Sequence, residues 1–439
     1  MTERAARSTS ARKTPRERPA RKAASKPEAQ PAERLSGPPD GETSRVGLVI
    51  AGAGARGAYE MGALSVLVPW LRERGEAPRI VVGTSAGAIN AVLVASILRA
   101  KDPLLAAEQA CDLWRRAAAR GVFRPLLTSL PKLGLRYLGQ LTRIGDGTVS
   151  AVLDPAPLRK LLSGATQLAQ VHDAVAEGSP EIVALIATAT GRHRTEAFVE
   201  TADPASLPAA DSARRVTYKP AHLTSEHIMA SAAIPVLFPS VRLSDPDGSA
   251  GDWYLDGGVR LNAPVKPALD LGADRLVVVA THPLVQPESP EPADLRPLDA
   301  FGSFATVITA TLVDRMVEDV RALDRVNRLL LAGAQDEAYR PVPYLFAGPE
   351  RNETIPAMAE AALHAYRGLE GMRNPDIAML DRLIGGTGST HGELLSYLLF
   401  EPEFIDALLE AGRSDAAQLI ESTEEPWVLT GSPPVGRRD

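Results

Sequence analysis

The sequence predicts an α/β protein: a three-layer fold with a central, mostly parallel sheet, followed by a mainly helical C-terminal extension. Between residues 46 and 99, an apolar run, a glycine-rich turn and a helical pattern occur twice in succession. Residues 181–188 and 276–281 are further uninterrupted apolar runs, which are typical of strands covered on both faces. Strands that alternate with helices in this way favour a parallel sheet between two helical layers.

The composition narrows the class of protein. The chain has 439 residues, of which 45% are hydrophobic and 23% charged, as in ordinary globular proteins. Its net charge of −6 gives no indication of nucleic-acid binding. The single cysteine, Cys111, cannot form an internal disulfide, so no oxidising compartment is implied. The longest apolar run, at residues 86–98, is too short to span a bilayer and no signal peptide is visible, so we expect a cytoplasmic protein.

The chain consists of three parts that differ in composition. Residues 1–44 are a predicted disordered tail, since the first 26 residues carry nine basic residues, two glutamates and almost no bulky apolar side chains. This tail is either simply solvated or contacts anionic lipid or nucleic acid. Residues 45–285 form the predicted catalytic domain. Residues 286–439 form the mainly helical region, which begins with a linker rich in proline and acidic residues.

The expected elements follow from periodicity and from the positions of glycine and proline. In chain order they are strands at 46–50 and 79–82, helices at 58–74, 86–99 and 108–119, strands at 181–188, 215–218 and 276–281, a helix at about 307–331 and a short strand at 344–347. Pro69 lies inside the first helix, where it can introduce a kink. Residues 121–141, rich in leucine and arginine, are expected to form either a flap that contacts lipid or a cap on the protein itself.

The first glycine-rich turn, GAGARG at residues 52–57, has two interpretations. It fits the G-x-G-x-x-G pattern of dinucleotide-binding loops, but such a site also needs an acidic residue at the end of the second strand, and this chain has none there. The alternative is electrostatic, because backbone N–H groups gathered at a helix N-terminus can bind an anionic oxygen. The loop is therefore a candidate oxyanion hole for a serine on the neighbouring strand.

The second turn is the G-x-S-x-G pentapeptide GTSAG at residues 83–87. In this pentapeptide the serine lies on a sharp turn between a strand and a helix, and the flanking glycines avoid Cβ clashes. A serine hydroxyl is a poor nucleophile at neutral pH and needs a base. Asp256, in the run LDGG, and His282, after the last strong strand, are the candidates. A Ser85–Asp256–His282 triad in the α/β-hydrolase order therefore stays open.

These motifs together resemble the bacterial patatin-like phospholipases, and the resemblance covers roughly residues 46–283. The matching stretches are, in the family's order, GAGARG at 52–57, GTSAG at 83–87, ASAAIP and FP within 230–239, DGG at 256–258 and NAP at 262–264. Ala53 departs from the pattern, because the family usually has a glycine at this position of the loop. The C-terminal stretch that begins at Leu394 is more loosely similar to extensions of some bacterial members.

The resemblance implies a Ser–Asp dyad that works without histidine. Ser85 would form an acyl-enzyme, and Asp256 would accept the serine proton and later activate water. An unperturbed aspartate has a pKa near 3.9, so Asp256 has to be partly desolvated to act as a base. The N–H groups of Gly52, Ala53 and Gly54 would stabilise the oxyanion. The other motif residues would support these turns: Arg56, which either braces the loop or binds a phosphate headgroup, and Gly57, Gly83, Gly87, Gly257 and Gly258.

The predicted function is hydrolysis of carboxylic esters of phospholipids or lysophospholipids, with the lipid class implied by the resemblance alone. No cofactor or metal is expected, because the remaining histidines show no metal-ligand spacing and no calcium-loop pattern occurs. Peripheral membrane contact is expected through residues 121–141 or the basic tail, and no nucleic-acid partner is expected. Two rival hypotheses remain: an esterase that uses the His282 triad, and a lipid-binding protein without catalysis.

Overall fold

A computed structural model describes residues 44–123, 151–244, 251–284, 315–334, 339–365, 389–422 and 425–431. They all belong to one compact unit, Ala32–Asp439. The predicted basic tail, the linker after residue 285 and most of the 121–141 segment lie outside the described residues.

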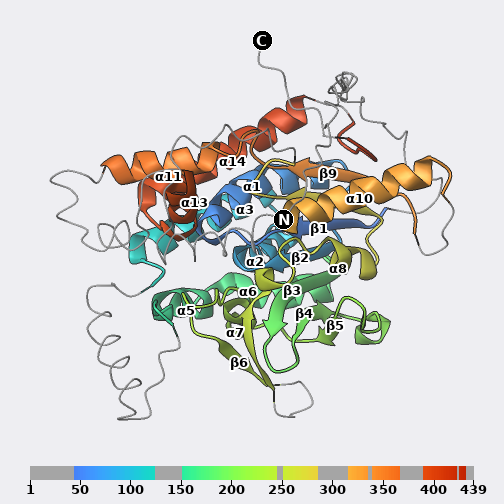
Figure 1. Ribbon diagram of the computed structural model, residues 1–439, viewed down its shortest axis with the longest axis horizontal. Helices are drawn as coiled ribbons and strands as arrows, with labels where there is room; N and C mark the ends of the chain where they lie inside the picture. The colour runs from blue at the N-terminus through green and yellow to red at the C-terminus, as the bar shows by residue number, and fades with distance from the viewer. Residues whose placement is uncertain are drawn as a thin grey trace, which may run out of the picture. The chain divides into compact units, whose positions relative to one another are not determined.

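A mostly parallel sheet forms the centre of the described structure (Figure 1). Its main path has the strand order β5-β4-β3-β2-β1-β8-β9, and the hairpin of β6 and β7 joins it at β3. The strands are β1 (Val46–Ile50), β2 (Ile80–Thr84), β3 (Ile182–Ala189), β4 (Arg194–Thr201), β5 (Val216–Pro220), β6 (Val241–Leu243), β7 (Asp252–Asp256), β8 (Arg275–Val279) and β9 (Tyr344–Ala347). Strands β3, β2, β1, β8 and β9 run parallel, and β3 is antiparallel to both β4 and β7. The predicted fold class is confirmed.

Helices cover the sheet and connect its strands. They are α1 (Gly57–Glu73), α2 (Ala86–Arg99), α3 (Pro103–Arg120), α5 (Ala156–Ser163), α6 (Thr166–Ala176), α7 (Ser225–Ser231), α8 (Val265–Asp270), α10 (Arg315–Leu331), α11 (Thr354–Ala365), α13 (Ser389–Leu398) and α14 (Pro402–Glu421). The ends of α2 and β9 agree with the sequence-based prediction. Helix α3 starts earlier than predicted, because Asp102 caps it by accepting the Leu105 N–H while Pro103 begins the first turn.

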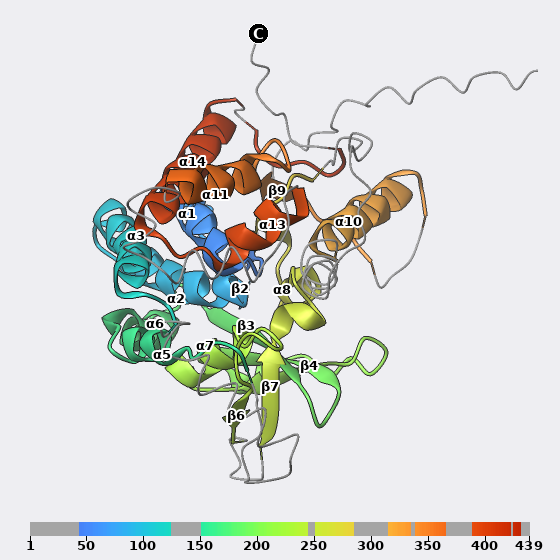
Figure 2. The ribbon, with the colours of Figure 1, turned by 60° about the vertical axis from the view of Figure 1, so that its left-hand side comes forward.

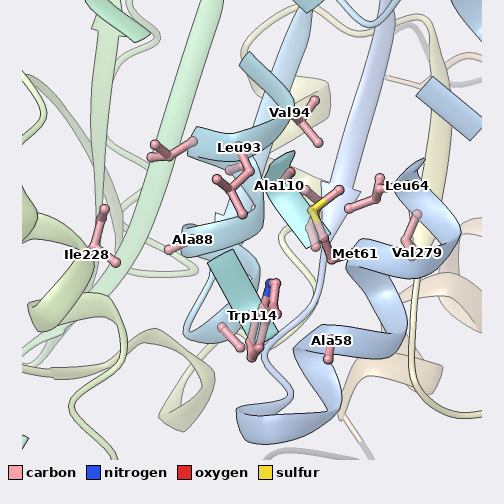
Figure 3. Close-up of a cluster of buried hydrophobic side chains, with 14 of the residues drawn as sticks. Ala58, Met61, Leu64, Ala88, Leu93, Val94, Ala110, Trp114, Ile228 and Val279 are labelled. Carbon is pink, nitrogen blue, oxygen red and sulfur yellow. The ribbon is translucent and has the colours of Figure 1, made fainter. Parts of the chain in front are cut away.

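The strands are buried on both faces, which explains their uninterrupted apolar runs. Along β1, Leu48 and Ile50 belong to one hydrophobic core and Val49 belongs to a second core on the opposite face. The first core includes residues of α1, α2, α3 and α14, and the second includes residues of α8 and α10. Figure 3 shows Met61, Leu93 and Trp114, from α1, α2 and α3, within the first core. The sheet and these helices thus form the three expected layers.

Two strands next to the site, β4 and β7, were not predicted from the sequence. Strand β4 is buried along most of its length although it contains two glutamates. Glu196 is fully buried there and pairs with Lys219 (2.7 Å) and with the Tyr254 hydroxyl (2.5 Å). Arg194 of the same strand also donates to Glu196, at 2.8 Å. The local pattern of β4 looks too polar for a core strand, because two of the partners that satisfy this buried carboxylate lie on other strands.

The C-terminal region shares the sheet and the core with the rest of the chain. Strand β9 pairs in parallel with β8, and α14 packs along α1 (Figure 2). Phe404, Ile405 and Leu408 of α14 are buried in the first core, and Tyr59 of α1 donates a hydrogen bond to Asp415 at 2.6 Å. The predicted boundary at residue 285 therefore marks a change of composition within one packed unit.

Candidate active site

The register of the sheet brings Ser85 and Asp256 together. Strand β2 pairs with β3 as far as Thr84, which lies opposite Ile186. Strand β7 pairs with β3 from the next position onward, where Asp256 lies opposite Ala187. Because β4 occupies the other edge of β3 along its whole length, β2 and β7 lie on the same side and their carboxyl ends meet. Residues 171 positions apart in the sequence thus become neighbours.

Ser85 has a strained backbone, as expected for a serine on a sharp turn between a strand and a helix. Its φ is 55° and its ψ is −123°, a conformation that non-glycine residues rarely adopt. The Ser85 N–H donates to Ser231 Oγ at 2.9 Å, and the Ser231 hydroxyl donates to the Ile186 carbonyl at 2.6 Å. Ser231 therefore ties the strained residue to β3 and satisfies a buried amide.

The Ser85 hydroxyl donates directly to Asp256 Oδ2, with 2.6 Å between the oxygens. The other carboxylate oxygen, Oδ1, accepts the Gly258 N–H at 2.8 Å. Asp256 is fully buried, and this burial raises its pKa to about 7, although the hydrogen bonds from Ser85 and Gly258 act in the opposite direction. Near neutral pH the carboxyl group can thus exchange a proton with the serine that it contacts.

The glycine-rich loop lies against the serine. A Cβ added at Gly52 would come within 2.9 Å of the Ser85 Cβ and 2.5 Å of Asn262 Oδ1, so only glycine permits this approach. The Gly52 N–H donates to Asn262 Oδ1 at 3.0 Å. Of the three amides predicted to form the oxyanion hole, this one thus already has an acceptor. Among the hydrogen bonds found in the described residues, none uses the N–H of Ala53 or Gly54.

The backbone of the loop explains which positions require glycine. Gly54 has a φ of +55°, and a Cβ there would lie 2.5 Å from the Tyr397 carbonyl oxygen, so both conformation and space exclude a side chain. Ala53 has a φ of −147°, a negative value that does not require a glycine. The replacement of the family's usual glycine by Ala53 is therefore compatible with this conformation.

Arg56 is fully buried and connects the loop to α13. Its Nε donates to Ser396 Oγ at 2.7 Å, and its Nη2 lies 2.9 Å from Glu393 Oε1. The guanidinium also lies over the Tyr397 ring, 4.4 Å from the centroid. Of the two roles considered for Arg56, this geometry favours bracing the loop over binding a headgroup.

His282 lies in the same buried group as Arg56. Its Nε2 is 2.7 Å from Arg56 Nη1 and 3.0 Å from Glu393 Oε1, and its Nδ1 is 3.3 Å from Thr281 Oγ1. In a triad the imidazole lies between the serine and the aspartate. Here the direct contact of Ser85 with Asp256 leaves no room between the two side chains for a ring.

An apolar pocket opens at Ser85. Gly54 of the loop and Ser85 belong to its lining, and the other lining residues come from α2, α3, α5, the segment after α7 and the residues just after α3 and α13. Apart from Ser85 the lining is apolar and includes Ile89, Trp114, Leu161, Ile234, Phe238 and Phe400. The pocket thus offers a hydrocarbon chain a place next to Ser85.

Several residues around this site lacked a clear signal in the sequence. Ser231 and Asn262 lie in the two supporting stretches noted beside the motifs, but nothing there indicated that they hold Ser85 and Gly52. Glu393 and Ser396 lie more than 300 residues after the loop that they contact, in a helix with no recognisable motif. The only local sign of Glu393 and Ser396 was Arg56, because an arginine that is buried must have a partner.

One comparison, with models of known protein families, agrees with the geometry of the site. The family model described as Patatin-like phospholipase matches residues 48–269, about half of the chain. Among solved structures, VipD from Legionella pneumophila is 15% identical, with 87% of this chain and 67% of that chain covered and a TM-score of 0.33. The ExoU–SpcU complex from the type III secretion system of Pseudomonas aeruginosa is 16% identical, with coverages of 87% and 74% and a TM-score of 0.25. Such TM-scores do not establish a common fold, and a comparison with curated proteins found no match.

Proposed function

The chain belongs to the patatin-like phospholipase family, and we propose that it hydrolyses carboxylic esters of phospholipids or lysophospholipids through an acyl-enzyme on Ser85. Membership in this family makes the chain a lipid acyl hydrolase. The observation that carries the finer proposal is the 2.6 Å contact between Ser85 Oγ and Asp256 Oδ2 at the end of an apolar pocket.

The proposed reaction has two halves. Ionised Asp256 accepts the Ser85 proton while Oγ attacks the ester carbonyl, and the amides of Ala53 and Gly54 stabilise the oxyanion. Protonated Asp256 then gives its proton to the departing alcohol, which leaves the acyl group on Ser85. In the second half, Asp256 takes a proton from a water that attacks the acyl-enzyme, and the fatty acid leaves as Ser85 regains its proton. The Gly52 amide contributes only if Asn262 releases it.

The acyl chain occupies the apolar pocket in this proposal. Trp114, Leu161 and Phe238 would surround it and exclude water from the ester. No helix among the described residues is both long and apolar enough to cross a bilayer. The segments predicted to contact membranes are not described, so peripheral binding stays a prediction.

Release of fatty acid from mixed phospholipid vesicles tests the proposal. Ser85→Ala and Asp256→Asn should each lower the rate by about 10⁴-fold or more, because each removes a group that takes part in both halves of the reaction. Asp203→Asn, a change in an exposed turn, serves as the matched control and should keep the wild-type rate. Full activity of Ser85→Ala would refute the proposal, and an inactive wild type in all vesicle compositions would favour the rival lipid-binding protein.

His282→Gln distinguishes the dyad from the triad. In a triad, loss of the histidine costs about a million-fold in rate. In the dyad, His282 only supports Arg56, so we expect a loss of at most about 100-fold in fatty-acid release. A His282→Gln variant as inactive as Ser85→Ala, with an unchanged melting temperature, would establish the triad instead.

A further inference from the structure

Two histidines and a glutamate that are far apart in the sequence meet at a second place in the fold. His172 lies in α6, Glu200 lies near the end of β4, and His222 lies in the loop between β5 and α7. Their ligand atoms all lie within 4.8 Å of one another. Spacings of 28 and 22 residues match no metal motif, which is why these histidines looked scattered in the sequence.

The carboxylate of Glu200 is the centre of this cluster. Its Oε1 lies 2.5 Å from His172 Nδ1 and 3.3 Å from His222 Nδ1. Its Oε2 accepts the Leu223 N–H at 2.8 Å, which fixes the orientation of the carboxylate beside His222. The Glu200 side chain is 9% exposed and that of His222 is 72% exposed, so the cluster is anchored inside and open to solvent on one side.

We propose that His172, Glu200 and His222 bind one divalent transition-metal ion of the Zn²⁺ type. Two imidazoles and one carboxylate are the protein ligands of many zinc sites, and such sites keep a further position open for water. With neutral imidazoles the cluster has one negative charge, which suits a dication. Glu200 also has the second-shell support typical of a ligand, since the Leu223 N–H holds its other oxygen. This proposal does not depend on the activity of Ser85.

Binding requires a defined local movement. In the structure the two imidazole rings are stacked, with centroids 3.5 Å apart and planes 17° apart. A metal ion lies close to the plane of each imidazole that binds it, and it cannot do so for two stacked rings. His222 therefore has to turn about its side-chain torsions, which its exposed position allows. His172 and Glu200, held on α6 and β4, need much smaller adjustments.

Metal binding at this place would cross-link three elements of the fold. The ion would link α6 and β4 to the loop that carries His222 and leads into α7. Helix α7 ends at Ser231, the residue that holds the Ser85 amide. We therefore expect the ion to raise the melting temperature by binding only the folded chain.

Calorimetric titration of the tag-free, EDTA-treated full chain with Zn²⁺ tests the site. We expect one ion per chain, and His172→Gln or His222→Gln should weaken the binding by at least about 100-fold, because even the loss of an outer-shell partner costs 10–100-fold. His364→Ala, a change at an exposed histidine of α11, is the matched control and should bind like the wild type. The Zn²⁺-dependent rise in melting temperature should disappear in the same two variants.

Substitution with Co²⁺ gives a spectroscopic check that does not depend on stability. The wild type should develop the visible absorption of cobalt bound to nitrogen and oxygen ligands, and His222→Gln should not. His222 is exposed, so its replacement leaves the fold intact and keeps the comparison meaningful. The proposal is overturned if the wild type binds Zn²⁺ no better than His222→Gln, or if His364→Ala loses binding to the same extent.

Discussion

Asp256 is buried, and no basic side chain is among the groups that shift its pKa. Its carboxylate contacts the hydroxyl of Ser85, which it is proposed to deprotonate. Burial raises its pKa from the ordinary 3.8 to about 7. The raised value means that neutral Asp256 stabilises the fold below about pH 3.8, and that this contribution is lost as the pH rises from about 3.8 to about 7. The same value makes the carboxylate a stronger base, which is the property that the reaction needs.

The pH dependence of hydrolysis follows from this pKa. In the proposed mechanism only ionised Asp256 accepts the serine proton, so kcat/KM should fall about tenfold per pH unit below pH 7 and reach a plateau above it. Initial rates of fatty-acid release between about pH 5 and pH 9 measure this profile. A rate that stays constant down to pH 5 would mean that Asp256 has an ordinary pKa and is not the base described here.

Ser231 should matter for the rate rather than for substrate binding. Ser231→Ala removes the acceptor of the Ser85 N–H and releases the strained turn from β3, which misplaces the nucleophile. We expect kcat to fall by about 10- to 100-fold with little change in KM. Steady-state kinetics of Ser231→Ala, with Ser206→Ala at an exposed position as control, test this prediction. An unchanged kcat would show that α2 and β2 hold the turn at Ser85 without the hydrogen bonds of Ser231.

Among the elements, α13 has the closest relation to the glycine-rich loop at residues 52–57. It supplies Glu393 and Ser396 to the buried Arg56, and its Tyr397 carbonyl lies where a side chain at position 54 would be. Burial by itself would raise the pKa of Glu393, but Arg56 and His282 more than compensate and lower it to about 2. Glu393 therefore stays ionised at any pH at which the enzyme works.

Glu393→Gln should loosen this connection. The change leaves the fully buried charge of Arg56 without its anionic partner, and breaking a buried pair in this way costs about 3 kcal/mol of unfolding free energy. Urea titrations compare this variant with Glu410→Gln, an exposed change on α14 that should cost less than about 0.5 kcal/mol. Equal stabilities of the two variants would show that His282 and Ser396 suffice to hold Arg56.

For the whole molecule, the structure implies that the C-terminal region is part of the catalytic unit. Strand β9 extends the sheet at β8, α14 covers α1, and α13 contacts the loop beside Ser85. A chain that ends at residue 338 would expose the edge of β8 and the apolar face of α1. We expect it to lose cooperative thermal unfolding by circular dichroism, whereas a chain that ends at residue 431 should melt like the full chain. A truncated chain that folds and hydrolyses lipid would contradict this.

The sequence was most informative where the structure depends on local pattern. Central strands, α2 and β9 follow from apolar runs and periodicity, and the turns at Gly52 and Ser85 follow from glycine spacing. Strand β4 was missed because its buried Glu196 makes it look too polar, and two of the groups that satisfy this carboxylate, Lys219 and the Tyr254 hydroxyl, come from other strands. The meeting of β2 and β7 beside β3 depends on register, which no local motif encodes.

The same distinction between local pattern and tertiary packing applies to the site and its surroundings. Ser85 and Asp256 were predicted because each lies in a short motif, and their contact in the structure agrees with that prediction. Glu393 and the cluster of His172, Glu200 and His222 form only through tertiary packing. Residues of this second kind become visible only when the three-dimensional arrangement is known.

Covalent labelling of the full chain with a lipid-like fluorophosphonate, followed by peptide mass spectrometry, tests the central claim most directly. The dyad predicts one adduct, on Ser85, formed faster as the pH rises through about 7 and at least about 10⁴-fold slower in Asp256→Asn. An adduct on a different residue, or labelling of Asp256→Asn at the wild-type rate, would show that Ser85 and Asp256 do not form the catalytic pair.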